Sequence, residues 1–565
     1  MNVGRLIFLL SRLRQATLRE LAHRGREQVC WKVLIKCPWL FYWLVRIPPI
    51  SVENTKRIHF FRIYPSLGRE ASSFSEDYVT ELAKSEGEDI RILWEPARLQ
   101  RITDLLQEQT EGRASTFQDA EKMLFQWLRD NPFLSYPHYL SVMECGLRLP
   151  VLLFALKRLK LSDEQCLQLH KSIFEHAWLI RQRLSLYSSL GNHTIAESVG
   201  LVLAGTIFAS HSKGREWFSK GLLLLDQELP HQIVRDGGPA EQSLSYHRFV
   251  LDLYWLIVDF LELNGFRDCS DWCIRLKAGE LFLAAFTDEC GFFPTIGDND
   301  NGYAIGAGLT PKRFVPESCR FGIKTFPDSG YTICRLGTGL HLTIDHGPLG
   351  MAPLYNHGHA DALSFTLRVH GVSFFVDPGT YRYNGVPKHR QYFKGTRAHN
   401  TVSIDGMDQA RQLTSFIWDK PYEAGAKILT RNGAYEIDAW HDGYQRLPMP
   451  VTHRRVFHVE EDTIRVCDFF QGKGVHDFDL HLHLHPEVKS NFCGDVLELE
   501  RDGLALTLHI NGSGKLDLVT GQEEPLLGWY SPAYGEIMPT TVVRFRQRGE
   551  PADVRFETCI QLKVV

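Results

Sequence analysis

The sequence predicts an α+β chain of several domains, in which a helical region precedes an antiparallel β-sandwich. The 565 residues exceed the roughly 250–300 residues at which single cores stop growing. From about Pro96 to Gly308, apolar residues recur at spacings of three and four, which is typical of helices. After Phe326 the chain changes to short alternating runs rich in Val, Ile, Thr and Phe, which indicate strands.

The N-terminal segment, residues 1–60, is basic and apolar. Its first apolar run, LIFLL, is too short for a signal peptide, so a cytoplasmic location is expected, with the periplasm as the alternative. A second apolar stretch, Val33–Ile47, is broken by Lys36, Pro38 and Arg46 and is shorter than the ~20 residues of a membrane span. We predict an amphipathic helix packed on its own domain; peripheral membrane contact is the alternative.

The second domain is predicted over residues 61–320. It contains long amphipathic segments such as AEKMLFQWLRDN, VLLFALKRLK and FVLDLYWLIVDFLELNG. Short turns with Gly, Asn or Pro separate them, as in stacked antiparallel helical pairs.

The third domain is predicted over residues 321–565, with the boundary between Lys312 and Asp328. Its strand signals include YTICRL, LHLTIDHG, LSFTLRVHG, VSFFVDPG and LALTLHING. Turn residues follow every eight to twelve positions or so, which is typical of a large antiparallel sandwich, two sheets deep.

Composition limits the partners. Lys and Arg number 63 against 67 Asp and Glu, a net charge of -4, so no general attraction to nucleic acid is expected. An acidic polysaccharide would need a local basic groove. The 12 cysteines contain no CxxC pair, and no disulfide is assigned.

The densest polar cluster is NHGHADALSF, which places Asn356, His357, His359 and Asp361 just before a strand. Alternate residues of an extended chain face the same way, so the two histidines can reach one site. Gly358 between them would let the backbone approach a ligand closely. Taken alone, the cluster favours two loop histidines satisfied by hydrogen bonds.

Two later segments, VDPGTYRY and YFKGTRAHNTVSIDG, favour a site over that alternative. His359, Asp377 and His399 together would form a two-nitrogen, one-oxygen ligand set that suits zinc or another divalent metal, completed by water or one more ligand.

The helical region holds two polar segments that open apolar helices. GNHTIAES carries Asn192, His193 and Glu197, and the second segment, GGPAEQSLSYH, carries Glu241 and Tyr246. The alternatives are structural: Asn192 or Ser198 as a helix cap, and Tyr246 as an ordinary half-buried tyrosine.

Two other patterns are not assigned to metals. His481, His483 and His485 share a strand face without a suitably spaced carboxylate, which favours a structural role. The run GDNDNG, Gly297–Gly302, lacks the terminal glutamate of a calcium loop, and we interpret it as a groove-lining turn.

With NHGHADALSF, VDPGTYRYNG and YFKGTRAHNTVSIDG in this order, and WEPAR, GNHTIAE and GGPAEQSLSYH upstream, the chain resembles the heparinase II/III superfamily over about residues 90–480. The resemblance implies an incomplete (α/α) toroid followed by a β-sandwich. It also implies a bacterial polysaccharide lyase that cleaves an acidic, uronate-containing polysaccharide by β-elimination, in a degradative or exopolysaccharide-related role.

The resemblance further implies roles for individual residues. Asn192, with His193 beside it, would neutralise the uronate carboxylate. Tyr246 would protonate the leaving oxygen and, with Arg248 or Arg397 lowering its pKa, could also remove the C5 proton; His357 is the alternative base.

The remaining implied roles concern binding and support. The zinc would be structural and would hold its ligands so that His357, Tyr381 and Tyr383 project toward the groove. Tyr381 joins the catalytic set, and Tyr383 and Arg397 join the substrate-binding set. Glu241 would bind a sugar or hold Tyr246.

Two other functions stay open. One is a carbohydrate-binding or assembly protein without turnover, since a fold does not determine a function. The other is a glycoside hydrolase, which needs two paired carboxylates. The available acids are Glu197, Glu241, Asp298 and Asp300.

Overall fold

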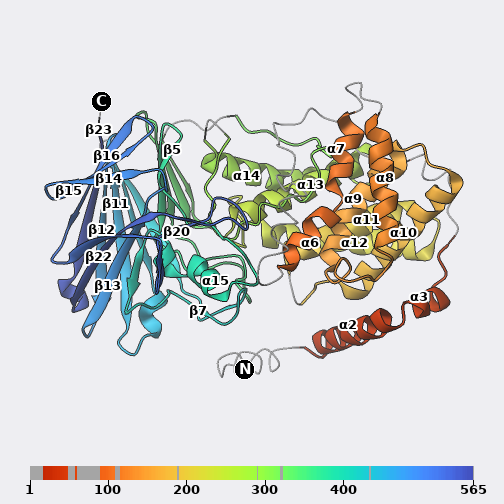
Figure 1. Cartoon of the computed structure of the whole chain (residues 1–565), viewed down its shortest axis with the longest axis horizontal. Helices are drawn as coiled ribbons and strands as arrows, with labels where there is room; N and C mark the ends of the chain where they lie inside the picture. Colours follow the sequence, from red (N-terminus) through yellow and green to blue (C-terminus); the bar gives the residue numbers. More distant parts are fainter. Residues whose placement is uncertain are drawn as a thin grey trace. The chain divides into compact units, whose positions relative to one another are not determined.

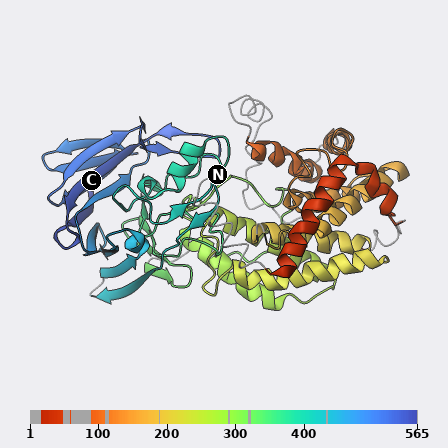
Figure 2. The ribbon, with the colours of Figure 1, turned by 90° about the horizontal axis from the view of Figure 1, so that it is seen from below.

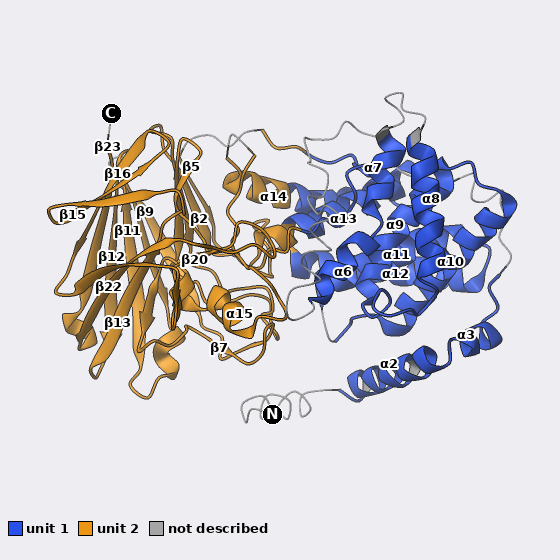
Figure 3. Ribbon diagram, in the orientation of Figure 1, with its two compact units in different colours: residues 1–232, 248–277, 302–314 blue, residues 233–247, 278–301, 315–565 orange. Residues whose placement is uncertain are grey.

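The structure is a computed structural model, and it describes residues 17–48, 58–59, 89–108, 115–187, 190–288, 291–317, 322–431 and 434–563. The chain forms two compact units (Figure 3). The helical unit holds residues 1–232, 248–277 and 302–314, and the β unit holds residues 233–247, 278–301 and 315–565.

The helical unit contains the long helices of the first half of the chain, which lie side by side (Figures 1 and 2). The helices are α2 (Leu18–Lys36), α3 (Pro38–Leu44), α6 (Ile90–Ala97), α7 (Gln100–Glu108), α8 (Ser115–Asp130), α9 (Val142–Arg158), α10 (Asp163–Arg183), α11 (Asn192–Ile207), α12 (Ser212–Gln232), α13 (Leu244–Leu263) and α14 (Ser270–Phe286). Both α13 and α14 cross from one unit to the other.

Glycines let the central helices of this unit approach closely. A Cβ atom on Gly146 of α9 would lie 2.5 Å from the carbonyl oxygen of Ala196 in α11. On the other side of the contact, a Cβ on Gly200 would lie 2.8 Å from the Leu149 side chain. Only hydrogen fits at these two positions, so α9 and α11 pack backbone against backbone.

The apolar stretch Val33–Ile47 forms parts of two helices, so the prediction of a single helix is wrong. Pro38 cannot donate a hydrogen bond within a continuing helix, and α2 therefore ends at Lys36 before α3 begins. Phe41 is fully buried and packs on Trp178 of α10 with a ring-centroid distance of 4.8 Å. Among the described residues, no helix is long and apolar enough to cross a membrane.

The β unit contains three large antiparallel sheets. The first has the order β1-β2-β3-β4-β5, the second β14-β15-β16-β23-β12-β11-β10-β9 and the third β17-β22-β13-β6. The strands of the first are β1 (Gly322–Phe326), β2 (Tyr331–Arg335), β3 (Leu340–Asp345), β4 (Phe365–Val369) and β5 (Val372–Phe375). Those of the second are β9 (Ala424–Arg431), β10 (Ala434–His441), β11 (Val451–Val459), β12 (Thr463–Gly472), β14 (Lys489–Cys493), β15 (Val496–Arg501), β16 (Leu504–Asn511) and β23 (Arg555–Lys563). Those of the third are β6 (Val402–Ile404), β13 (His476–His483), β17 (Lys515–Thr520) and β22 (Thr541–Gly549).

Side chains from all three sheets meet in one hydrophobic core. Leu367 of β4, Phe457 of β11 and Phe545 of β22 all belong to it. Inward residues alternate with outward ones, as β16 shows with buried Leu506, Leu508 and Ile510. The prediction of a helical toroid followed by an antiparallel sandwich is confirmed.

Short helices and strands complete the β unit. They are α15 (Pro387–Lys394), η2 (Thr396–Ala398), β7 (Arg411–Gln412), β8 (Trp418–Asp419), η3 (Gly443–Arg446), β18 (Gln522–Glu523), β19 (Leu526–Leu527), β20 (Trp529–Tyr530), β21 (Met538–Pro539) and η4 (Pro551–Asp553). The first strand begins at Gly322, inside the predicted boundary interval, but the β unit also takes residues 233–247 and 278–301 from the helical part of the sequence.

Candidate functional site

Asp298 is the centre of a buried polar cluster in the β unit. Its carboxylate accepts two hydrogen bonds from Arg390, at 2.5 Å from Nη1 and 2.7 Å from Nη2. His357 Nδ1 lies 3.2 Å from Oδ2, and His359 Nε2 lies 3.0 Å from Oδ1. The two histidines of the NHGHAD segment therefore meet at one carboxylate.

The charge of Asp298 determines which ring nitrogen of His357 carries the hydrogen in the neutral imidazole. Burial alone would raise the pKa of Asp298, but the Arg390 guanidinium and the histidine hydrogen bonds hold it well below its ordinary value. An ionised carboxylate only accepts hydrogen bonds, so Nδ1 of His357 carries the hydrogen. In the neutral imidazole, Nε2 is then the nitrogen without a hydrogen, and it lies 4.0 Å from Glu241 Oε2. His357 is thus arranged as a base.

Tyr246 lies against His357. It occupies the first turn of α13, where its N–H donates to Ser243 Oγ at 3.2 Å. Its ring stacks on the imidazole of His357 with a centroid distance of 3.9 Å and an interplanar angle of 24°. The Tyr246 hydroxyl lies 3.1 Å from that of Tyr383 and 3.4 Å from Asp300 Oδ2.

Tyr383 keeps its proton in this environment. Burial, together with the neighbouring Tyr246, Asp298 and Asp300, raises the pKa of Tyr383 well above its ordinary value. Its hydroxyl can therefore donate to the oxygen of Tyr246. A phenol and an imidazole side by side can give and take a proton within one small volume, which is the requirement of general acid–base chemistry.

Helix α15 supplies Arg390 and secures the histidine loop. Burial and the charge of Arg390 lower the pKa of Lys394 on this helix well below its ordinary value, and Lys394 Nζ donates to the Asn356 carbonyl at 3.1 Å. Trp418 Nε1 donates to the Gly358 carbonyl at 2.9 Å. A Cβ on Gly358 would lie 1.7 Å from the Leu349 carbonyl oxygen. Gly358 therefore allows close contact with the main chain at Leu349. A close approach of this backbone to a ligand stays a prediction.

His359, Asp377 and His399 form a cluster that fits a metal. Their ligand atoms all lie within 4.8 Å of one another, and all three residues are buried. His399 Nδ1 lies 3.0 Å from Asp377 Oδ2, and His359 Nε2 is held by Asp298. The other ring nitrogens, His359 Nδ1 and His399 Nε2, are buried with no hydrogen-bond partner in the described part of the chain. A carboxylate outside the ligand set that orients a ligand histidine, as Asp298 does for His359, is typical of metal centres.

Two other predicted site residues make different contacts. Tyr381 is half-buried, donates its backbone N–H to Ser531 Oγ at 3.0 Å, and its ring lies 5.5 Å from that of His389. Arg397 Nη2 donates to the Gly406 carbonyl at 3.3 Å, and its side chain lines a pocket to whose lining neither Tyr246 nor His357 contributes. Their catalytic and substrate-binding roles stay predictions.

Asn192 and His193 begin α11 in the helical unit. The residue that caps this helix is Gly191, with φ of 99°, and Ser198 lies inside the helix, so the interpretation of Asn192 or Ser198 as a cap is wrong. Asn192 is fully buried, whereas His193 is half-buried. Their roles toward a substrate stay predictions.

Glu197, one turn further along α11, gives a prediction of pH-dependent stability. Its carboxyl accepts hydrogen bonds from Ser185 N at 2.8 Å and Ser185 Oγ at 2.6 Å, and burial raises its pKa to about 8. The folded chain thus binds this proton more tightly than the unfolded chain. The stabilisation is fully present below the ordinary value of 4.5 and is lost as pH rises toward about 8.

We expect Glu197→Gln to flatten this dependence by an amount on the order of a few kcal/mol between pH 5 and pH 8. The measurement is the free energy of unfolding by urea at both pH values. Glu216→Gln is the matched control, because the Glu216 side chain is 50% exposed and pairs with Arg181 at 2.7 Å. An equal slope in parent and Glu197→Gln would contradict the prediction.

The histidine-bearing strand β13 and the acidic turn Gly297–Gly302 differ in whether they contribute to the site. His481 and His483 are buried on β13 with ring centroids 6.4 Å apart, and among the described residues they join no metal-like group. The acidic turn, by contrast, supplies Asp298 and Asp300 to the site itself. Sequence reasoning treated Asp298 only as a candidate hydrolase acid and missed Arg390. The dense acids of GDNDNG and the basic KHR run before YFKG were the available signals.

Comparisons with known families match two parts of the chain. Residues 320–562 match the family described as Heparinase II/III-like, C-terminal, and residues 124–271 match the one described as Heparinase II/III N-terminus. A heparin-sulfate lyase of Bacteroides stercoris is 25% identical over 422 residues, which cover 67% of this chain and 58% of the relative. The chain thus spans well under two thirds of that relative's length.

Solved structures share the fold. A heparinase III crystal structure superimposes with a TM-score of 0.66 at 17% identity, covering 96% of this chain and 91% of the other. A heparan sulfate lyase of Pedobacter heparinus gives a TM-score of 0.57 at 18% identity, covering 92% and 84% of the two chains. At this identity the likeness shows the architecture of a helical part followed by β-sheets.

Proposed function

The chain belongs to the heparinase II/III-like superfamily, and we propose on this basis that it is a polysaccharide lyase that cleaves a uronate-containing polysaccharide by β-elimination. The observation that carries the proposal is the stack of Tyr246 on His357, with His357 held by the ionised Asp298. A binding groove alone does not need a phenol and a base in contact.

The proposed reaction needs an acid and a base but no attacking water. Nε2 of His357 removes the proton from C5, next to the uronate carboxylate. The electron pair forms the C4–C5 double bond as the C4–oxygen bond breaks. The Tyr246 hydroxyl gives its proton to the departing oxygen, and Tyr383 then hydrogen-bonds the tyrosinate. In an alternative assignment, Tyr246 performs both proton transfers.

Charge develops on the uronate carboxylate during this reaction. For Asn192 and His193 we propose, from the family resemblance alone, that they neutralise it. Glu241, whose Oε2 lies 4.0 Å from His357 Nε2, would orient the base or a sugar hydroxyl.

The test is the ultraviolet absorbance of unsaturated uronate over a panel of uronate polysaccharides, with heparan sulfate, alginate and the source bacterium's own exopolysaccharide included. We expect absorbance to rise with at least one polymer and His357→Ala to suppress it. New reducing ends without absorbance would indicate a hydrolase. Binding without any cleavage would indicate a carbohydrate-binding or assembly protein.

We also propose that His359, Asp377 and His399 hold one structural zinc ion, which when bound would cross-link the loops that carry them. We expect about one zinc per chain by elemental analysis. His399→Ala should lose the metal and melt at a lower temperature. His458→Ala is the control, because that side chain is 38% exposed on β11. Metal content equal in parent and His399→Ala would contradict the assignment.

A further inference from the structure

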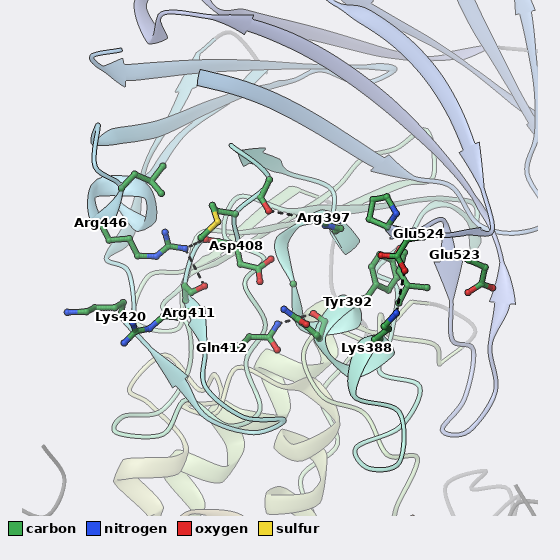
Figure 4. A pocket seen from close by; sticks show the side chains of 18 of the residues that line it. Lys388, Tyr392, Arg397, Asp408, Arg411, Gln412, Lys420, Arg446, Glu523 and Glu524 are labelled. Carbon is green, nitrogen blue, oxygen red and sulfur yellow. Dashed lines mark hydrogen bonds and ion pairs between the residues drawn. The ribbon is translucent and has the colours of Figure 1, made fainter. Parts of the chain in front are cut away.

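The β unit contains a cavity of about 680 Å³ that the proposed reaction does not use (Figure 4). It is lined by α15, η2, the segment after β6, β7, η3 and the turn between β18 and β19. Tyr246, His357 and Asp298 are not among its lining residues. Its volume is within the range of ligand pockets, about 300–1,000 Å³.

The charges around this cavity are mainly positive. Five cationic side chains line it, namely Lys388, Arg397, Arg411, Lys420 and Arg446. In Figure 4, Arg411, Lys420 and Arg446 lie on one side, and Lys388 lies on the other beside Glu524.

Three acidic side chains also line the cavity, namely Asp408, Glu523 and Glu524, and Arg411 pairs with Asp419 nearby, so the acids offset the five cations only in part. Glu524 pairs with Lys388 at 3.4 Å, but both side chains are at least 80% exposed, so the pair is weak. Asp408 accepts the N–H of Thr396 at 2.9 Å, and burial raises its pKa, while this hydrogen bond and the charges of Arg397 and Arg446 lower it.

Arg397 and Arg446 carry charge that the protein does not neutralise by contact. Arg397 Nη2 donates to the Gly406 carbonyl at 3.3 Å. Arg446 Nη2 donates to the carbonyls of Asp408 and Ala410. Neither arginine forms an ion pair with a carboxylate within 4.0 Å among the residues described, and Arg446 Nε is buried without a partner. These contacts use one nitrogen of each guanidinium group and leave other donors for an anion.

We propose that this pocket binds a segment of an acidic oligosaccharide, with Arg397 and Arg446 holding its carboxylate or sulfate groups. A fixed guanidinium binds such planar or multi-oxygen anions through paired hydrogen bonds. Met407, Pro448 and Pro525 add apolar surface that suits the faces of sugar rings. The anionic character of the ligand follows from the pocket itself, and its identity as a saccharide rests on the proposed function.

The experiment uses the full chain carrying Tyr246→Phe, so that no substrate is consumed. Hydrogen–deuterium exchange is followed by mass spectrometry with a heparin-derived hexasaccharide, an alginate hexasaccharide and neutral maltohexaose. We expect an acidic ligand to protect peptides over residues 388–412 and 444–448, and maltohexaose to leave them unchanged. Because no turnover is needed, this result is independent of whether the chain proves to be a lyase.

Affinity in the same background is measured by calorimetry. Arg397→Gln with Arg446→Gln should weaken binding by about tenfold or more, since charge-assisted hydrogen bonds are lost. Both guanidinium groups also hold main-chain carbonyls, so a second variant, Arg411→Gln with Lys420→Gln, removes two exposed charges, of which Arg411 pairs with Asp419. This variant should weaken binding severalfold. The matched control is Arg465→Gln with Lys515→Gln, two side chains that are 51% and 73% exposed on other strands.

Three results would overturn the proposal. The first is protection confined to peptides around Tyr246 and His357. The second is equal affinity of the pocket variants and the control. The third is equal protection by maltohexaose, or by inorganic sulfate or a nucleotide at the same concentration, which would remove the saccharide from the assignment.

Discussion

Replacing Tyr246 with phenylalanine should lower kcat by about 100- to 10,000-fold, which is the usual contribution of a positioned general acid. The substitution keeps the ring that stacks on His357 and removes only the hydroxyl that lies 3.1 Å from Tyr383 and 3.4 Å from Asp300. The loss of one such contact is worth about 1 kcal/mol, so the fold should persist. The measurement is the initial rate of unsaturated uronate formation, with the melting temperature recorded alongside.

Tyr435→Phe provides the comparison for this experiment. Tyr435 is a half-buried tyrosine on β10 that packs against the sandwich core, so its variant tests for a general effect of removing a phenol. We expect it to retain the parent's kcat. If Tyr246→Phe also retains it, another group must protonate the leaving oxygen, and the assigned role is wrong.

Asp298→Asn should be the most destabilising single change at the site. The side chain is fully buried, and the asparagine would leave the Arg390 guanidinium buried without its counter-charge. Breaking a buried ion pair on one side typically costs about 3–5 kcal/mol. His357 would also lose the acceptor that fixes which of its nitrogens carries the hydrogen, so activity should fall with stability. Urea unfolding and the absorbance assay measure the two effects.

A double variant separates these effects. In Asp298→Asn with Arg390→Met, no unpaired charge remains in the cluster, so part of the lost stability should return. Activity should not return, because His357 still lacks its carboxylate. If the double variant loses as much free energy of unfolding as the two single variants together, the ion pair contributes nothing beyond the packing of each side chain.

The sequence was sufficient to predict most of the regular elements because their periodicity reflects burial. LALTLHING became β16, and its buried leucines alternate as the pattern required. The stretch Val33–Ile47 was misjudged because its apolar content continues across Pro38, whereas the helical hydrogen bonds do not. The assignment of residues 233–247 and 278–301 to the β unit depends on tertiary contacts that no local pattern reveals.

The candidate site was predictable only in part. His357, His359 and Tyr246 stood out because histidines and tyrosines in polar segments beside strands have few structural reasons to cluster. Asp298 did not, because an acidic turn is usually a solvated loop; its meaning comes from Arg390, which is 92 positions away in the sequence. Ion pairs between residues so far apart produce no regular spacing in the sequence from which they could be predicted.

The division of the β unit along the sequence affects how this fold can be divided into fragments or recombined. Glu241, Tyr246 and Asp298 belong to the unit of the sheets, yet all three precede β1 in the chain. A fragment that starts at Gly322 would contain all three large sheets but would lack these three side chains. Exchange of whole sandwiches between relatives at that boundary would therefore combine the proposed acid, Tyr246, from one parent with the proposed base, His357, from the other.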